Sequence, residues 1–171
     1  MQLKPDIYQK DIYHINYDSL YQKGIRFLIF DLDNTVAALD EKVPSVSALK
    51  LFSKLKTRFS CLLLSNSLKK RVKPFGEALG IPYLSCAMKP ISFRLKHYLR
   101  KEKISLNQVA IVGDQFMTDM VLGKKLGIVT IFVDVLAKKD YKITGFNRYR
   151  EKKIIDQYEQ NHLFERGKYY E

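Results

Sequence analysis

The chain of 171 residues lacks features that several classes of protein require. It has no tryptophan, only two cysteines and only three histidines, and neither a CxxC pair nor a zinc-ligand spacing is present. These absences argue against a disulfide-stapled scaffold and against a zinc site. The apolar runs have only strand length, so we expect no segment to cross a bilayer, and the first ten residues lack the apolar core of a signal peptide. We therefore expect a cytoplasmic protein.

Negative charge is scarce too, and its shortage is local. The formal net charge is +12, and residues 42–103 hold fifteen Lys or Arg against two Asp or Glu. Such an excess is unusual in an enzyme that acts on small soluble metabolites. It suits a polyanionic partner, either an anionic lipid surface or a nucleic acid, or it is no more than a set of solvated helix faces.

One domain is expected over residues 1–171, because no repeat, low-complexity tract or Gly/Ser linker divides the chain. Within it we distinguish an N-terminal extension (1–24), a core (25–134) and a basic-aromatic C-terminal extension (135–171). The strands predicted from apolar runs are 25–30, 60–65, 82–84, 108–114 and 128–134. The predicted helices are 18–23, 45–56, 68–79, 90–101, 118–126 and 147–160. This alternation predicts a doubly wound parallel sheet between two layers of helices.

Two details of these helices can be tested against a structure. The helix at 45–56 should bury one stripe formed by Val46, Leu49, Phe52 and Leu55. The helix at 90–101 should begin at Pro90, because proline fits the first helical position.

The main chemical signal is a pair of carboxylates at the end of the first predicted core strand. Residues 27–35 read FLIFDLDNT, in which Asp31 and Asp33 follow an apolar run. The carboxyl ends of parallel strands are where open α/β sheets bind ligands. Carboxylates crowded at this edge repel each other unless a cation or phosphate chemistry lies between them. Ser65, Lys89, Asp114 and Asp119 occupy similar positions, at strand ends or before helices.

In chain order, DxDxT, Ser-Asn, Lys-Pro and GDxxxxD resemble the four motifs of the haloacid dehalogenase (HAD) superfamily. The segments DLDNT, LSNS, GDQFMTD and TGFNRYRE are most similar to the YqeG-like family of type III (subfamily IIIA) HAD phosphatases. That family is related to mitochondrial phosphatidylglycerophosphate phosphatases. The sequence departs from the family at Val36-Ala37, where many relatives have Leu-Val, and at Ser67, where a second Asn is usual. The resemblance implies a Rossmannoid α/β/α sandwich without a cap domain.

The resemblance also implies roles for the motif residues in a Mg²⁺-dependent phosphatase. Asp31 would be the nucleophile that forms an aspartyl-phosphate, and Asp33 would be the general acid and base. Mg²⁺ would be held by Asp31, the backbone carbonyl of Asp33, Asp114 and, directly or through water, Asp119. Ser65 and Lys89 would bind the phosphoryl oxygens. The supporting substrate-binding positions are Thr35, Asn66, Lys69 and Arg71.

The substrate is expected to be bulky or bound to a surface. The gaps after the first motif and between the second and third leave no room for a cap, and an open site cannot enclose a small substrate. Phosphatidylglycerophosphate at the inner face of a membrane is one candidate, reached by peripheral association. The alternative to an enzyme is a binding protein: a nucleic-acid or ribosome-associated protein built on a HAD core, with weak or no phosphatase activity. The sequence leaves open whether Tyr141, Tyr149, Tyr158, Tyr169 and Tyr170 pack on the core, contact a subunit or touch a membrane.

Overall fold

The computed structural model describes residues 3–136, 145–161 and 164–171, and in the first seven residues of the last helix it describes only the backbone. The strands are β1 (Ile7–Gln9), β2 (Phe27–Phe30), β3 (Ser60–Leu64), β4 (Tyr83–Leu84), β5 (Val109–Gly113) and β6 (Val129–Val133). The helices are α1 (Tyr17–Gln22), α2 (Val46–Leu55), α3 (Lys69–Leu79), α4 (Phe93–Lys101), α5 (Val121–Leu126) and α6 (Gly145–Gln160). A short 3₁₀ turn (Leu106–Gln108) precedes β5, and a π-helical turn (Phe116–Met120) precedes α5.

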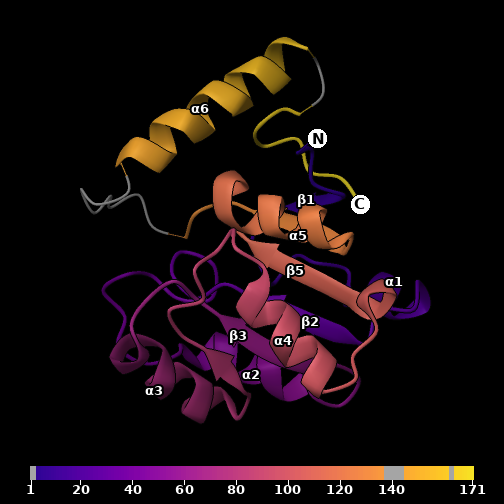
Figure 1. Cartoon of the computed structure of the whole chain (residues 1–171), viewed down its shortest axis with the longest axis vertical. Helices are drawn as coiled ribbons and strands as arrows, with labels where there is room; N and C mark the ends of the chain where they lie inside the picture. The colour runs from indigo at the N-terminus through magenta and orange to yellow at the C-terminus, as the bar shows by residue number, and fades with distance from the viewer. Residues whose placement is uncertain (1–2, 137–144, 162–163) are drawn as a thin grey trace.

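One parallel sheet with the strand order β1-β6-β5-β2-β3-β4 forms the centre of the molecule. Helices α1, α2 and α3 pack on one face, where their apolar side chains meet those of alternate sheet residues such as Leu28 and Phe30. Helices α4 and α5 cover the other face, against Phe27 and Ile29. This alternation follows from the period of two in a strand. The predicted three-layer architecture is confirmed, and the connections from β2 to α2, from β3 to α3 and from β4 to α4 hold no inserted cap (Figure 1).

The helix ends follow the predicted chemistry in several places. The Ser45 side chain accepts a hydrogen bond from the backbone of Ala48 and so caps α2. Gly80 and Gly127 end α3 and α5 in the left-handed conformation, which glycine adopts without steric cost.

Two predictions within the helices are wrong. Val46 and Leu49 are exposed, at 67% and 39%, and the buried stripe of α2 is Ala48, Phe52 and Leu55. The apolar pattern permitted two neighbouring stripes, and the one that includes the small Ala48 faces the sheet. Helix α4 does not begin at Pro90 but three residues later, because residues 88–91 form a turn in which the Ile91 amide donates to the Met88 carbonyl.

The extension over residues 1–24 is also more than an appendage. It supplies β1, the edge strand of the sheet, which pairs with β6. This strand is hard to predict from the sequence because only three residues pair, and charged or turn residues flank them. The described tail residues pack on β1: the backbones of Tyr8 and Tyr170 exchange hydrogen bonds of 2.8 and 2.9 Å.

A third apolar cluster joins the C-terminal extension to the rest of the fold. Tyr8, Phe116, Phe132, Ile155 and Phe164 are all buried in it, and Tyr158 and Tyr170 pack against it. Of the tail tyrosines that the structure describes, Tyr158 and Tyr170 therefore pack on the core, and Tyr169 hydrogen-bonds Asp134. Tyr141 and the side chain of Tyr149 lie outside the described residues. Figure 1 shows α6 and the C-terminal segment together at the β1 end of the molecule.

Candidate active site

The centre of the sheet places two acidic strand ends side by side. From β2 the chain winds outward through β3 in one direction, whereas β5 and β6 lie on the other side of β2. This reversal creates a topological switch point between β2 and β5, the usual ligand position in an open α/β sheet. Asp31 directly follows β2, and its amide donates to the carbonyl of Val112 in β5 at 2.9 Å. Asp114 directly follows β5.

Three buried carboxylates meet at this point. Asp31, Asp114 and Asp119 each offer one oxygen, and these oxygens lie within 4.8 Å of one another. Asp119 comes from the π-helical turn after β5, whose extra backbone residue changes the helical register just before α5 begins. All three residues are buried, with at most 6% of the surface of each exposed. Their spacing allows them to share one hard cation such as Mg²⁺.

Lys89 supplies a single positive charge in the middle of this cluster. Its ammonium donates to Asp31 Oδ1 and to Asp119 Oδ1, both at 2.6 Å. Its backbone is fixed by Asn66, whose amide side chain accepts from the Lys89 N–H at 2.7 Å and donates to its carbonyl at 3.1 Å. These two hydrogen bonds hold the backbone of Lys89 against the loop that follows β3.

The electrostatics of the cluster indicate a deficit of positive charge. Burial raises the pKa of Asp31, and repulsion by Asp119 adds to this, although Lys89 opposes it. Burial and the neighbouring Asp31 and Asp119 likewise raise the pKa of Asp114. Burial alone would lower the pKa of Lys89, but the two carboxylates outweigh it and the net shift is upward. Three carboxylates face one ammonium, so a divalent cation would balance the site.

Asp33 lies apart from these three carboxylates and has its own partners. Ser67 Oγ donates to Asp33 Oδ2 at 2.5 Å, and Arg71 Nε donates to Asp33 Oδ1 at 2.9 Å. Arg71 also donates to the backbone carbonyls of Ala38 and Glu41. Arg71 is thus bonded to Asp33 and to the segment that follows it, whereas the sequence predicts Arg71 as a substrate ligand. In the sequence, Ser67 is only a departure from the family pattern, because a hydroxyl two residues after Ser65 is too common a feature to indicate a role.

The other residues singled out in the sequence lie around the cluster. Ser65 is buried at the end of β3, and its hydroxyl accepts from the Ser67 amide at 3.0 Å. Thr35 Oγ1 donates to Asp114 Oδ1 at 3.0 Å and so orients that carboxylate. Lys69 is exposed at the start of α3. Their roles in phosphate binding remain predictions.

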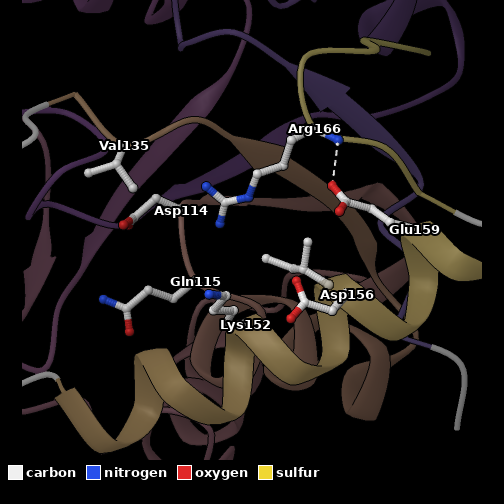
Figure 2. A pocket seen from close by; sticks show the side chains of 8 residues that line it. Asp114, Gln115, Val135, Lys152, Asp156, Glu159 and Arg166 are labelled. Carbon is white, nitrogen blue, oxygen red and sulfur yellow. Dashed lines mark hydrogen bonds between the residues drawn. The ribbon is translucent and has the colours of Figure 1, made fainter.

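A cavity of about 390 Å³ opens beside Asp114, and sequence reasoning did not anticipate it. Its lining combines the loop after β5, the segment after β6, α6 and the C-terminal loop: Asp114, Gln115, Val135, Lys152, Ile155, Asp156, Glu159 and Arg166. Figure 2 shows the guanidinium of Arg166 reaching into the space between α6 and Asp114, while the Arg166 amide donates to Glu159 at 3.2 Å. The C-terminal extension therefore forms one wall of the space next to the carboxylate cluster.

Comparison with known proteins gives the chain a family. The profile described as mitochondrial PGP phosphatase matches residues 1–136. The protein of Bacillus subtilis (strain 168) described as a probable phosphatase YqeG is 33% identical over 152 residues, which cover 88% of each chain.

Solved structures share the fold at low sequence identity. A predicted HAD-like family hydrolase from Porphyromonas gingivalis matches 74% of this chain and 98% of its own, with 14% identity and a TM-score of 0.53. A HAD family enzyme from Bacteroides thetaiotaomicron, solved as a magnesium complex, matches 70% of this chain and 98% of its own, with 14% identity and a TM-score of 0.55. These matches establish the HAD-like fold.

Proposed function

Because the chain belongs to the mitochondrial PGP phosphatase family and is therefore a phosphatase, we propose that it hydrolyses phosphomonoesters in a Mg²⁺-dependent reaction through an aspartyl-phosphate on Asp31. The observation that carries this proposal is the buried cluster of three carboxylates around one ammonium at the switch point. A protein that only binds nucleic acid has no need of such a costly arrangement, because uncompensated buried charge destabilises the fold.

The residues fit a magnesium ion by charge and by ligand chemistry. Asp31, Asp114 and Asp119 would hold it together with the backbone carbonyl of Asp33, and all of these ligands are oxygen atoms. When bound, Mg²⁺ would screen the negative charge of a phosphate dianion from the carboxylate that attacks it.

The first half-reaction uses the groups on both sides of the site. The Asp31 carboxylate attacks phosphorus, the ester P–O bond breaks, and Asp33 in its protonated form gives its proton to the leaving oxygen. Ser65 and Lys89 bind the transferring phosphoryl oxygens. An ammonium has three N–H donors, and two of those of Lys89 bond to Asp31 and Asp119, so the third can donate to the phosphoryl group. Ser67 and Arg71 hold the Asp33 side chain in place.

The second half-reaction regenerates the enzyme. Asp33, now ionised, takes a proton from a water molecule as the water attacks phosphorus. The bond between phosphorus and Asp31 breaks, and inorganic phosphate leaves. One carboxylate can serve both steps because it ends each cycle in the protonation state in which it began.

The substrate is proposed to be bulky or held at a surface, with phosphatidylglycerophosphate as the leading candidate. The described connections after β2, β3 and β4 hold no inserted cap, and the cavity beside Asp114 leaves room for an organic group. None of the helices in the described part of the chain has the length and apolar character of a membrane span.

The catalytic proposal is tested with p-nitrophenyl phosphate. We expect phosphate release that requires Mg²⁺ and falls at least about a thousandfold in Asp31→Asn, which keeps the shape but removes the nucleophile. Asp18→Asn is the matched control, because Asp18 pairs with Arg58 at the surface and should leave the rate unchanged. Wild-type turnover by Asp31→Asn would refute the assignment. A second screen presents phosphatidylglycerophosphate in mixed micelles beside sugar phosphates, nucleotides and phosphopeptides.

A further inference from the structure

Four large apolar side chains are exposed in the two segments that contain Ser65 and Lys89 and lead into α3 and α4. Leu68 is 60% exposed and directly follows the loop after β3, whereas Met88, Ile91 and Phe93 lie after β4 and are 58%, 54% and 75% exposed. Single exposed apolar residues are common on protein surfaces, but a group of them on adjacent loops indicates an interaction surface.

The two loops are held together by backbone hydrogen bonds. The amides of Cys86 and Ala87 donate to the carbonyls of Ser67 and Ser65, each at 2.9 Å. Arg94 braces the second loop by donating to the carbonyl of Ser85 at 2.8 Å and to that of Cys86. The apolar side chains are thus displayed from an ordered frame at the mouth of the active site.

Basic residues lie close to these apolar residues along the chain. Helix α3 begins with Lys69, Lys70 and Arg71, has no acidic residue in its first turn, and continues with the exposed Lys73. Positive charge at a helix N-terminus is opposed by the helix dipole, so the arrangement costs local stability. Arg94 and Lys96 are exposed at the start of α4. We name the apolar residues Leu68, Met88, Ile91 and Phe93, together with Lys70, Lys73 and Lys96, the amphiphilic rim.

We propose that the amphiphilic rim docks on an anionic lipid bilayer. The apolar side chains enter the boundary between head groups and acyl chains, and the lysines contact lipid phosphates. Aliphatic side chains such as Leu68, Met88 and Ile91 favour a bilayer over a nucleic acid, because single-stranded nucleic acids are gripped mainly by aromatic stacking. Docking brings the open site to the phosphomonoester of a lipid, so this inference deepens the proposed function, although docking itself requires no catalysis.

Flotation with vesicles measures docking directly. Wild-type protein should float with vesicles of phosphatidylglycerol and phosphatidylcholine at low salt, less at moderate salt, and little with phosphatidylcholine alone. The apolar pair Leu68→Ser/Phe93→Ser and the charge pair Lys70→Glu/Lys73→Glu should each weaken binding about tenfold or more. Leu106→Ser and Lys101→Glu/Lys125→Glu are matched controls. Leu106 lies just before β5, and Lys101 and Lys125 lie at the ends of α4 and α5. All three residues are exposed near the N-terminal ends of the strands, away from the carboxyl ends that carry the site.

A fluorescent probe adds a readout that does not depend on loss of binding. The chain has no tryptophan, so Phe93→Trp introduces a single one. Its emission should shift to shorter wavelength on addition of anionic vesicles, whereas that of Leu106→Trp should not. No shift in Phe93→Trp, or flotation of both rim variants at the wild-type level, overturns the inference.

Two further measurements, an RNA gel shift and a hydrolysis assay, distinguish failure of the docking proposal from failure of the phosphatase proposal. If wild-type protein shifts RNA in a gel but does not float with anionic vesicles, the rim is a nucleic-acid surface and the inference is overturned. Hydrolysis of p-nitrophenyl phosphate is measured without lipid. Intact hydrolysis without flotation refutes docking alone, whereas flotation without hydrolysis refutes the phosphatase proposal and supports docking.

Discussion

At the scale of single residues, the site depends on close approaches as much as on charged groups. Gly113 ends β5 directly beneath Asp119: a Cβ at this position would lie 2.3 Å from the Asp119 carboxyl carbon and from its Oδ2. The absence of a side chain at Gly113 is therefore what lets Asp119 turn toward Asp31 and Asp114.

Gly113→Ala should displace Asp119 and weaken metal binding. We expect the Mg²⁺ concentration for half-maximal phosphate release to rise about tenfold or more. Gly76→Ala is the matched control, since its Cβ would lie 2.5 Å from the Tyr83 ring, away from the carboxylates. It should lower the melting temperature without changing the Mg²⁺ dependence. Equal Mg²⁺ curves for Gly113→Ala and the wild type would contradict this account of Asp119.

Ser67 should act as a positioning residue for Asp33. Ser67→Ala removes the hydroxyl that donates to Asp33 Oδ2 and leaves the ion pair with Arg71 in place. We expect kcat to fall about tenfold with a smaller change in KM, because the proton transfer is affected more than phosphate binding. Ser67→Asn, which restores a side-chain donor, should recover part of the loss. A change confined to KM would assign Ser67 to substrate binding instead.

At the scale of elements, the catalytic core depends on both chain ends. The π-helical turn that carries Asp119 also carries Phe116, and Phe116 packs against Phe132 and Phe164 with ring centroids 4.6 and 5.3 Å apart. Phe164 belongs to the C-terminal extension and is 3% exposed. The extension thus packs against the turn that carries Asp119.

Phe164→Ala should destabilise the fold by about 3 kcal/mol, because it removes a buried aromatic side chain. Phe164→Leu, which keeps most of the apolar volume, should cost clearly less. Urea unfolding of both variants measures the difference in the free energy of unfolding. If Phe164→Ala unfolds at the wild-type midpoint, the extension does not pack on the core as described.

The Asp6 carboxylate, just before β1, ties this strand to the fold by accepting hydrogen bonds from residues of β6 and α5. Asp6 accepts from the amide and the hydroxyl of Thr130 at 2.8 and 2.7 Å and from the Lys124 ammonium at 2.5 Å. Partial burial opposes ionisation of Asp6, but these donors outweigh it and lower its pKa below the ordinary value of 3.8. Ionised Asp6 therefore contributes stability above about pH 4, and this contribution is lost as the pH falls through the lowered pKa.

Asp6→Asn should accordingly be less stable than the wild type at neutral pH. The difference in urea midpoint should shrink as the pH falls below about 4, where the wild-type carboxylate becomes protonated. Asp40→Asn, an exposed surface change, serves as the control. If the difference in urea midpoint between the wild type and Asp6→Asn grew as the pH fell, ionised Asp6 would not stabilise the fold and this account would be refuted.

At the scale of the whole molecule, the charges are divided between an acidic centre and a basic exterior. Three buried carboxylates around one lysine lower the stability of the metal-free fold, whereas most of the excess of Lys and Arg in residues 42–103 is exposed. The acidic centre fits a divalent cation, and the basic exterior includes the surface for which we propose an anionic bilayer as the partner.

Removal of Mg²⁺ should therefore lower thermal stability. At a hundredfold excess over its dissociation constant, Mg²⁺ should add about 3 kcal/mol to the free energy of unfolding. Asp114→Asn should melt at a higher temperature than the wild type in EDTA, because it removes one repelling charge, and should lose the stabilisation by Mg²⁺. Melting curves with Mg²⁺ and with EDTA test both statements. Equal stabilisation of wild type and Asp114→Asn by Mg²⁺ would place the ion elsewhere.

The alternation of strands and helices and the position of the acidic motifs can be predicted from the sequence alone. A buried parallel strand needs a continuous apolar run, so a carboxylate at its end stands out, and parallel strands necessarily bring Asp31 and Asp114 to the same edge. These inferences use only periods of two and 3.6 residues and the direction of the chain.

Which side chains contact one another depends on the three-dimensional fold and could not be predicted. Ser67 and Arg71 meet Asp33 from a loop and a helix more than thirty residues away, and no periodicity encodes such contacts. The same holds for β1, whose three residues become a strand because β6 and the chain's last residues supply their hydrogen-bond partners. Short segments carry too little local preference to fix their own structure, so the rest of the fold determines it.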